Sequence, residues 1–192
     1  MGSANGDDPE FFNWTFRALS LAGAGGVTLA ATVFPKAKIA VARAVISSAD
    51  VVFLGGGEVD NGMNALKRCG IDDLLVTLCR QGKPFIGLSA GSIMLGRQWI
   101  RWPNENDLSR FELFSCLGCA PVICDTHAEG EGWVELKALL RAGGHGVHGY
   151  GIPAGGCLVV ESDGRCAALG KPVLEFTNVH GSVRRFGAVA PS

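Results

Sequence analysis

The sequence predicts an α/β fold, with a mostly parallel sheet flanked by helices and an antiparallel extension at the C-terminal end. Up to Gly96, short apolar runs alternate with segments of helical periodicity, a pattern typical of a parallel sheet covered on both faces. From Gly149 onward, short strands follow one another with turn residues between them, which favours antiparallel pairing. We assign residues 1–192 to a single domain, because a chain of this length buries a substantial core.

The first half begins with a helix over 8–23. Asp8 is an N-cap residue, Pro9 occupies the first helical position, and a glycine closes the apolar pattern. A strand is then predicted over 26–34, a helix over 35–49, and a buried strand over 50–57 that ends in three glycines.

The rest of the chain continues this alternation and then changes character. We predict a helix over 61–82, a strand over 83–88 and the start of a helix over 90–96. A loop over 100–112, a strand over 113–127 and a helix over 131–144 follow. Short strands follow to residue 187. The turn residues Ser162, Asp163 and Gly164 lie between two alternating runs and predict a hairpin.

Composition limits the partners. Hydrophobic residues make up 47% of the chain and charged residues 18%, with a net charge of -1, so we expect no nucleic-acid partner and favour a small peptide or neutral substrate. No apolar run reaches the roughly 20 residues needed to cross a bilayer. The first twelve residues lack a basic start followed by an apolar stretch. We therefore predict no membrane partner and a cytoplasmic location.

The seven cysteines predict reduced, mostly buried thiols rather than a disulfide framework, since their number is odd and no secretory signal is visible. A zinc site is the alternative for Cys116, Cys119, Cys124 and His127. All four lie within twelve residues of apolar sequence, and a second short cysteine pair at the usual distance is missing. We therefore predict no metal and no cofactor.

The motif Gly87-Leu88-Ser89-Ala90-Gly91 lies where an apolar strand meets a helix start. In that context Gly-x-Ser-x-Gly is a nucleophile elbow, whose serine projects from the carboxyl end of the sheet, where open α/β sheets bind ligands. The alternative is an ordinary glycine-rich turn in which Ser89 caps the helix. Strand, turn and helix in this order favour the elbow.

A serine nucleophile needs a base and a group that orients the base. His127 follows a strand directly, like Ser89, whereas His145 and His148 lie in a glycine-rich connection and His180 in a turn. We select His127 as the base; its alternative role is a loop histidine beside acidic residues. The carboxylates that remain open as its partner are Glu105, Asp107, Asp125, Glu129 and Glu131.

The tetrahedral intermediate also needs donors for its oxyanion. Three glycines, residues 55–57, end the strand that we expect beside the elbow strand. The N–H groups of Gly56 and Gly57, together with that of Ala90, are therefore candidates for the oxyanion hole. Phosphate binding is the alternative for this turn, but no Lys-Ser/Thr follows it and the Gly-x-Gly-x-x-Gly spacing is missing.

Between Ser48 and Phe176 the segments ADVVFLGGGE, GKPFIGLSAGS, DTHAE, GYGIPAGGCLVV and CAALGKPVLEF resemble the serine peptidase family of aspartyl dipeptidase (dipeptidase E) and cyanophycinase. This resemblance implies a class I glutamine amidotransferase-like fold, a flavodoxin-type three-layer sandwich with serine in place of the elbow cysteine. It implies a Ser-His-acid peptidase in which the nucleophile is Ser89 and the base His127. The spacing of the family's acid favours Asp107, followed by Glu105.

Two departures from the family affect these expectations. Residues 3–12 resemble the loop after a strand that this chain lacks, which would leave a sheet edge to be covered by a partner subunit, as in a homodimer, or by the C-terminal strands. After His127, where the dipeptidases place a basic residue for an acidic substrate, three acids precede the first base. A neutral or basic substrate group is at least as compatible with these charges.

Two other functions remain as alternatives. An α/β-hydrolase esterase shares the elbow, but its histidine generally lies much further from the serine than His127 does. An amidotransferase-like binding or regulatory domain would keep the fold without the chemistry.

Overall fold

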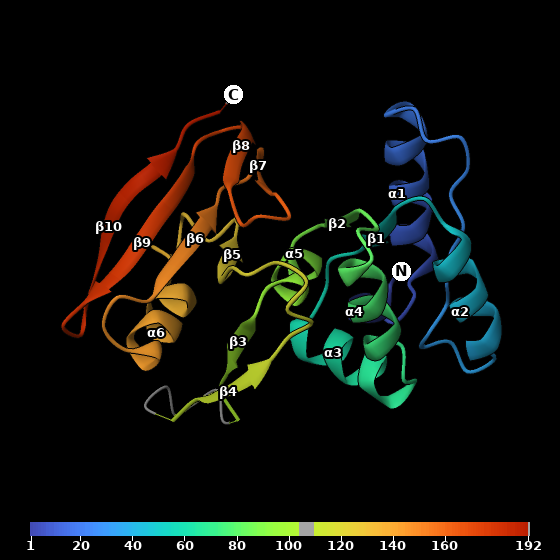
Figure 1. Cartoon of the computed structure of the whole chain (residues 1–192). Coiled ribbons are helices and arrows are strands. Elements are labelled where there is room, and N and C mark those ends of the chain that lie inside the picture. Colours follow the sequence, from blue (N-terminus) through green and yellow to red (C-terminus); the bar gives the residue numbers. More distant parts are fainter. Residues whose placement is uncertain (104–109, 192) are drawn as a thin grey trace. The chain divides into compact units, whose positions relative to one another are not determined.

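The computed structural model describes residues 1–103 and 110–191 (Figure 1). Helices and strands are both present, which confirms the α/β class. The sheets are small and mixed in direction, however: among the described residues two strand pairs are parallel and four antiparallel, so the mostly parallel sheet expected from the sequence is not observed. The chain divides into two compact units, Met1–Met94 and Leu95–Ser192. Each unit is described by itself, and the assignment to a single domain stays a prediction. Among the described helices, none combines the length and the apolar character needed to cross a membrane.

In the first unit, helices surround a two-stranded parallel sheet of β1 (Val52–Leu54) and β2 (Phe85–Gly87). The helical elements are η1 (Ser3–Asn5), α1 (Pro9–Leu21), α2 (Ile39–Ser48), α3 (Val59–Arg68), α4 (Asp72–Arg80) and α5 (Ala90–Leu95), the last of which ends at the first residue of the second unit. Apolar side chains from β1, α3, α4 and α5 form the core; those that are at most 2% exposed include Leu54, Met63, Leu66, Leu75 and Met94.

Helix α1 begins as the sequence predicts. The Asp8 side chain accepts hydrogen bonds from the N–H groups of Glu10 (2.7 Å) and Phe11 (3.3 Å), and Pro9 is the first helical residue. The helix buries little of its apolar surface, however, since Trp14 is 57% and Leu21 91% exposed. Local capping therefore matters more for α1 than core packing does.

The strand predicted over 26–34 is wrong, because this segment is an irregular connection. Buried Asp7 explains the difference: its Oδ2 accepts hydrogen bonds from the N–H groups of Thr32 (2.6 Å), Val33 (2.5 Å) and Phe34 (3.2 Å). Three consecutive N–H groups that share one carboxylate oxygen cannot alternate between neighbouring strands. A tertiary contact thus overrides the β-branched character of the segment.

The second unit contains a four-stranded sheet in the order β10-β9-β6-β5. Strands β5 (Cys124–Thr126) and β6 (His148–Ile152) pair in parallel, whereas β6 with β9 (Val173–Val179) and β9 with β10 (Ser182–Val189) pair antiparallel. The antiparallel pairing expected near the C-terminus is therefore present.

Helix α6 (Val134–Gly143) packs on this sheet through Leu136, Leu139 and Leu140, which are fully buried. Two separate hairpins complete the unit. They join β3 (Gln98–Arg101) with β4 (Glu112–Ser115), and β7 (Gly156–Val160) with β8 (Cys166–Gly170).

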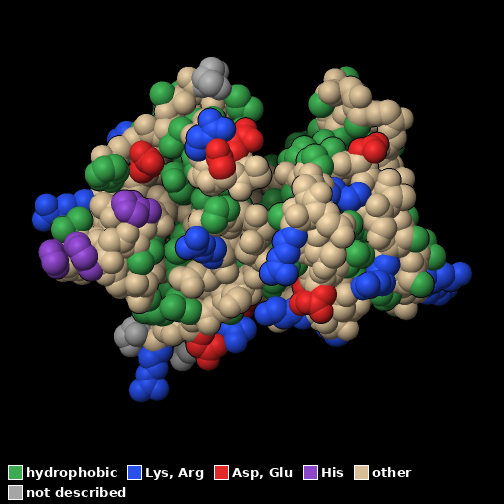
Figure 2. Space-filling model, viewed as in Figure 1, with side chains coloured by type: hydrophobic (Ala, Val, Ile, Leu, Met, Phe, Trp, Pro, Cys, Tyr) green, Lys and Arg blue, Asp and Glu red, His purple; other side chains and the backbone are tan. Residues whose placement is uncertain are grey.

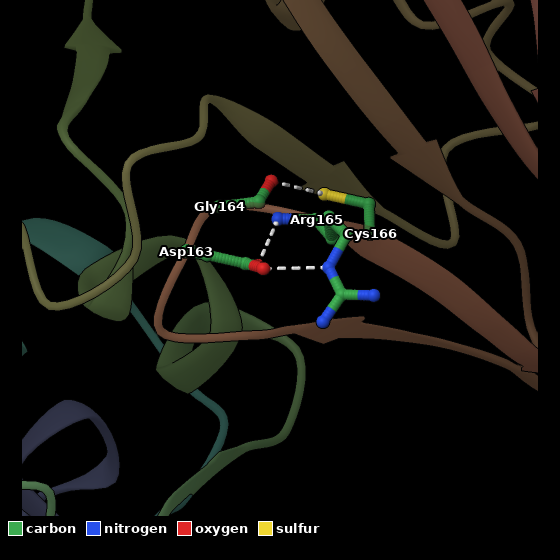
Figure 3. A network of polar contacts seen from close by, with 4 residues as sticks. All are labelled: Asp163, Gly164, Arg165 and Cys166. Atoms are coloured by element: carbon green, nitrogen blue, oxygen red, sulfur yellow. Dashed lines mark hydrogen bonds and ion pairs between the residues drawn. The ribbon is translucent and has the colours of Figure 1, made fainter.

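Two predictions for this unit need correction. Residues 100–112, expected as a loop, include the end of β3 and the start of β4, and the strand expected over 113–127 is divided into β4 and β5. The turn between β7 and β8 is as predicted (Figure 3): Asp163 accepts a hydrogen bond from the N–H of Arg165 (3.0 Å), and its carboxylate forms an ion pair with the same arginine (2.6 Å). Gly164 adopts a positive φ of 84° there, which glycine accommodates without strain.

Candidate active site

Ser89 lies in the turn between β2 and α5, with a φ of 52°. A positive φ is uncommon for a residue with a Cβ and costs of order 1–3 kcal/mol, so it persists only where the surrounding structure enforces it. The strand side is held by a hydrogen bond from the Leu88 N–H to the Leu54 carbonyl (3.0 Å), and the helix side by one from the Ser92 N–H to the Ser89 carbonyl (2.8 Å). The turn therefore has the geometry of a nucleophile elbow.

The two glycines of the motif are required by packing. A Cβ on Gly87 would lie 2.5 Å from the Cα of Ser92, and a Cβ on Gly91 would overlap the Leu54 carbonyl group. In both cases the obstacle is backbone, which cannot rotate away. The small residues thus let strand, turn and helix approach each other closely enough to form the elbow.

The glycine turn after β1 lies directly against Ser89. A Cβ on Gly56 would be 3.1 Å from the Ser89 Cβ and 3.6 Å from its Oγ, so only glycine leaves open space beside the hydroxyl. Within residues 1–103 and 110–191, no hydrogen bond is recorded from the N–H groups of Gly56, Gly57 or Ala90. The structure thus brings Gly56, one of the predicted oxyanion donors, close to the predicted nucleophile.

The chain's first residues hold this glycine turn in place. Asn5 donates from Nδ2 to the Gly56 carbonyl (3.0 Å), and the N–H groups of Gly55 and Glu58 donate to the carbonyls of Met1 (2.9 Å) and Ala4 (2.8 Å). A Cβ on Gly57, whose φ is 131°, would overlap the Ala4 carbonyl. Sequence reasoning missed this role of Asn5, which no motif signals.

His127 belongs to the second unit and follows β5 directly, as predicted. Its φ is 45°, its side chain is exposed, and its N–H donates to the Ile152 carbonyl (2.8 Å), which continues the β5–β6 pairing by one residue. A histidine at the carboxyl end of a parallel strand occupies the same class of position as Ser89. Asp107 and Glu105, the acids favoured as its partner, lie outside the described residues.

Asp125, two residues before His127, is only 4% exposed. Its Oδ1 accepts a hydrogen bond from the Thr126 N–H (2.7 Å), whereas no partner is found for Oδ2 among the described residues. Burial raises the pKa of this carboxyl to about 6, against the opposing effects of the Thr126 and Leu136 N–H groups and of the His127 charge. Asp125 is thus a buried acid that titrates near neutral pH.

The turn after His127 carries two exposed acids, Glu129 and Glu131. Glu129 accepts a hydrogen bond from the Ala154 N–H (3.0 Å). Its pKa is lowered by backbone hydrogen bonds, from its own N–H first and then from Ala154, with a smaller effect of the Lys171 charge. The surface beside His127 is therefore acidic.

The other three histidines are exposed on the second unit, where Figure 2 shows histidine side chains at the surface. The rings of His145 and His180 stack with centroids 4.2 Å apart, and His148 contacts the edge of Phe186. His180 adopts a φ of 51° in the turn between β9 and β10. The ring of each of these three histidines thus packs on a neighbouring ring of its own unit.

The cysteines are all reduced thiols, as predicted, but the prediction that they are mostly buried is wrong: Cys124 is buried, Cys157 is exposed and the other five are half-buried. Burial raises the pKa of Cys124 to about 12, so this thiol is neutral at physiological pH. Over 1–103 and 110–191, no group of three or more histidine, cysteine or acidic side chains has an arrangement that could hold a metal ion.

Comparison with known proteins relates the chain to peptidases, in agreement with the nucleophile-elbow geometry of Ser89. The profile of peptidase family S51 matches residues 3–165. Peptidase E of Streptomyces coelicolor is 34% identical over 82 residues, which cover 43% of this chain and 33% of that protein. Peptidase E of Shewanella amazonensis is 35% identical over 88 residues, which cover 44% of this chain and 36% of that protein. The aligned segments thus span about a third of the length of these curated relatives. Because the family match extends over most of the sequence, the chain belongs to peptidase family S51.

Proposed function

We propose that this chain is a serine peptidase that hydrolyses a small peptide or isopeptide bond, with Ser89 as the nucleophile. One observation carries the proposal: in a member of family S51, Ser89 is held at positive φ between a strand and a helix, with Gly56 against its hydroxyl. We further propose the amidotransferase-like sandwich as the complete fold. The parallel pairs β1–β2 and β5–β6 are compatible with it.

In the proposed mechanism, Ser89 Oγ attacks the substrate carbonyl while His127 takes the hydroxyl proton. The N–H groups of Gly56, Gly57 and Ala90 stabilise the oxyanion. Collapse of the tetrahedral intermediate breaks the C–N bond, and His127 returns the proton to the leaving amine. Water then attacks the acyl-enzyme with the same base, which releases the acid and regenerates the serine. Asp107 accepts a hydrogen bond from the imidazole throughout.

The substrate class that we propose is a short peptide with a neutral or basic group near the scissile bond. The exposed carboxylates of Glu129 and Glu131, in the turn that begins at His127, support this class because they would repel an acidic group. A dipeptide series with acidic, neutral and basic first residues tests it. We expect the acidic members to have the lowest kcat/KM.

A fluorophosphonate probe tests the nucleophile. We expect covalent labelling of the wild-type chain, none of Ser89→Ala, and unchanged labelling of Ser47→Ala, which removes an exposed hydroxyl from α2. Peptidase turnover of Ser89→Ala should fall by several orders of magnitude. A labelled Ser89→Ala variant would contradict the assignment, and an unlabelled wild type would favour an amidotransferase-like domain without catalysis.

A further inference from the structure

The buried carboxylate of Asp125 has no place in the mechanism above, although it lies two residues from the proposed base. The chain between Asp125 and α6 is a tight turn, closed by hydrogen bonds to the Ala128 carbonyl from the N–H groups of Glu131 (3.2 Å) and Trp133 (3.1 Å). Besides Gly132, two residues of this turn have positive φ, His127 at 45° and Trp133 at 62°. Neither is a glycine, so neighbouring groups must hold this turn in its conformation.

The Asp125 carboxylate is hydrogen-bonded at the start of the turn and lies near its end. At the start, its Oδ1 accepts from the N–H of Thr126, the residue before His127. At the end, the N–H of Leu136 lies close enough to lower the pKa of the carboxyl. Leu136 is in the first turn of α6, whose N-cap residue Trp133 provides no side-chain hydrogen bond. A negative charge facing the uncapped N-terminus of a helix is favourable, although the cost of burying the charge is larger here and raises the pKa overall.

The sheet fixes Asp125 from the other side. Asp125 is paired with Gly151 of β6, and a Cβ on Gly151 would lie 2.9 Å from the ring of Trp133. The Trp133 ring therefore fills the space that a side chain at position 151 would take. This packing places the residue that ends the turn against β6, the strand paired with the one that begins the turn.

We propose that Asp125 is a positioning residue for His127, whose ionised carboxylate joins the end of β5 to the start of α6 and so holds the turn that presents the imidazole. This inference rests on the proposed function, because it is as a base that His127 has to be held in place. Asp125 is not assigned to the reacting atoms, and the triad acid remains Asp107.

The charges around Asp125 set the pH range of this effect. Burial raises its pKa to about 6, the charge of His127 lowers it and that of Glu131 raises it, while Cys124 is a neutral thiol at this pH. Tyr150 on β6 also ionises only far above neutrality, because burial raises its pKa to about 12. Asp125 therefore changes from mostly neutral to mostly charged between about pH 5 and pH 7.

The test compares fluorophosphonate labelling rates of the wild type and Asp125→Asn from pH 5 to pH 8.5, with Asp163→Asn in the exposed hairpin turn as the matched control. We expect Asp125→Asn to react about tenfold more slowly than the wild type at pH 8. At pH 5, where Asp125 of the wild type is itself protonated, the two rates should agree within about twofold. Asp163→Asn should follow the wild type at every pH.

A ratio of rates that does not change with pH would overturn the proposal, as would equal rates at pH 8. A wild-type chain that fails to react at all would instead contradict the proposed function. In that case a second measurement still tests the inference, namely the ¹³C titration of the Asp125 carboxyl by NMR. We expect a midpoint near pH 6 that moves upward in His127→Asn, because the variant loses the imidazolium charge; an unmoved midpoint would overturn the coupling of the two residues.

Discussion

Two residues of the proposed site are placed by an uncommon backbone conformation. Ser89 and His127 both adopt positive φ, and both occupy turns that follow directly on a parallel strand. The sequence motif predicts the first of these, because Gly-x-Ser-x-Gly records the two positions where a Cβ would collide with backbone. No comparable motif marks His127, whose turn is closed by backbone hydrogen bonds to the Ala128 and Ile152 carbonyls.

Gly56 offers a test of how closely the glycine turn approaches the nucleophile. In Gly56→Ala, the added methyl group would press on the Ser89 Cβ at 3.1 Å, so we expect fluorophosphonate labelling to slow by about tenfold to a hundredfold. The unfolding free energy should fall by about 1–3 kcal/mol, as is usual for overpacking. Gly25→Ala is the control, because nothing lies within 4 Å of the added atom. Equal labelling of both variants would show that Gly56 is not close to the reacting hydroxyl.

Asp125 gives the pH dependence of stability. Its pKa is raised from 3.8 to about 6 in the folded chain, so its contribution to stability is fully present below about pH 4 and is lost as the pH rises through 6. The loss amounts to about 3 kcal/mol at pH 8, at about 1.4 kcal/mol per pKa unit.

Asp125→Asn should therefore be more stable than the wild type at pH 8 and equally stable at pH 4, as measured by urea denaturation. A variant that is less stable at pH 8 would show that the hydrogen bonds of the carboxylate outweigh its burial. Together with slower labelling, a more stable variant would also separate the positioning role from a general loss of structure.

At the scale of helices and strands, the sequence predicts those features that depend on contacts between residues close together in the chain. The start of α1 at Pro9 and the hairpin turn at Ser162-Asp163-Gly164 were both predictable, because Asp8 caps the helix and Gly164 supplies the positive φ locally. The connection 26–34 was not, because its N–H groups bond to Asp7, which is 25 residues from Thr32 in sequence. An apolar, β-branched segment is able to pair with a neighbouring strand. Here its N–H groups bond to the buried Asp7 carboxylate instead.

The cap of α1 is a prediction at this scale. Asp8→Ala removes the acceptor for the N–H groups of Glu10 and Phe11, and we expect the unfolding free energy to fall by about 1 kcal/mol. Asp8→Asn retains a side-chain oxygen and should stay within a few tenths of a kcal/mol of the wild type. Urea denaturation followed by circular dichroism measures both. Equal losses in the two variants would assign the effect to charge at the helix N-terminus instead of to the cap.

At the scale of the whole molecule, the predicted residues divide between two compact units. Ser89 and the three oxyanion donors belong to Met1–Met94, and His127 to Leu95–Ser192. The sequence predicted the local structure around each residue because each follows an apolar strand. It could not predict the division into units, which depends on long-range contacts that periodicity does not record.

His127→Asn tests whether catalysis needs residues of both units. Asparagine tolerates positive φ, so we expect a small change in stability and a loss of labelling by about a thousandfold or more. His148→Asn, which replaces an exposed histidine of β6 in the same unit, should label like the wild type. Retained labelling of His127→Asn would mean that another group takes the proton from Ser89.

The close packing of the nucleophile elbow against β1 affects which substitutions of the nucleophile the site can accept. A Cβ at position 87 or 91 would overlap backbone, and one at position 56 would press on the Ser89 Cβ, so the location of the reactive atom is built into the backbone. Its identity depends on residue 89 alone, and a thiol is only slightly larger than a hydroxyl. A Ser89→Cys exchange would therefore replace the nucleophilic oxygen by sulfur without moving the backbone. It would separate the effect of the nucleophilic atom's chemistry from the effect of its position.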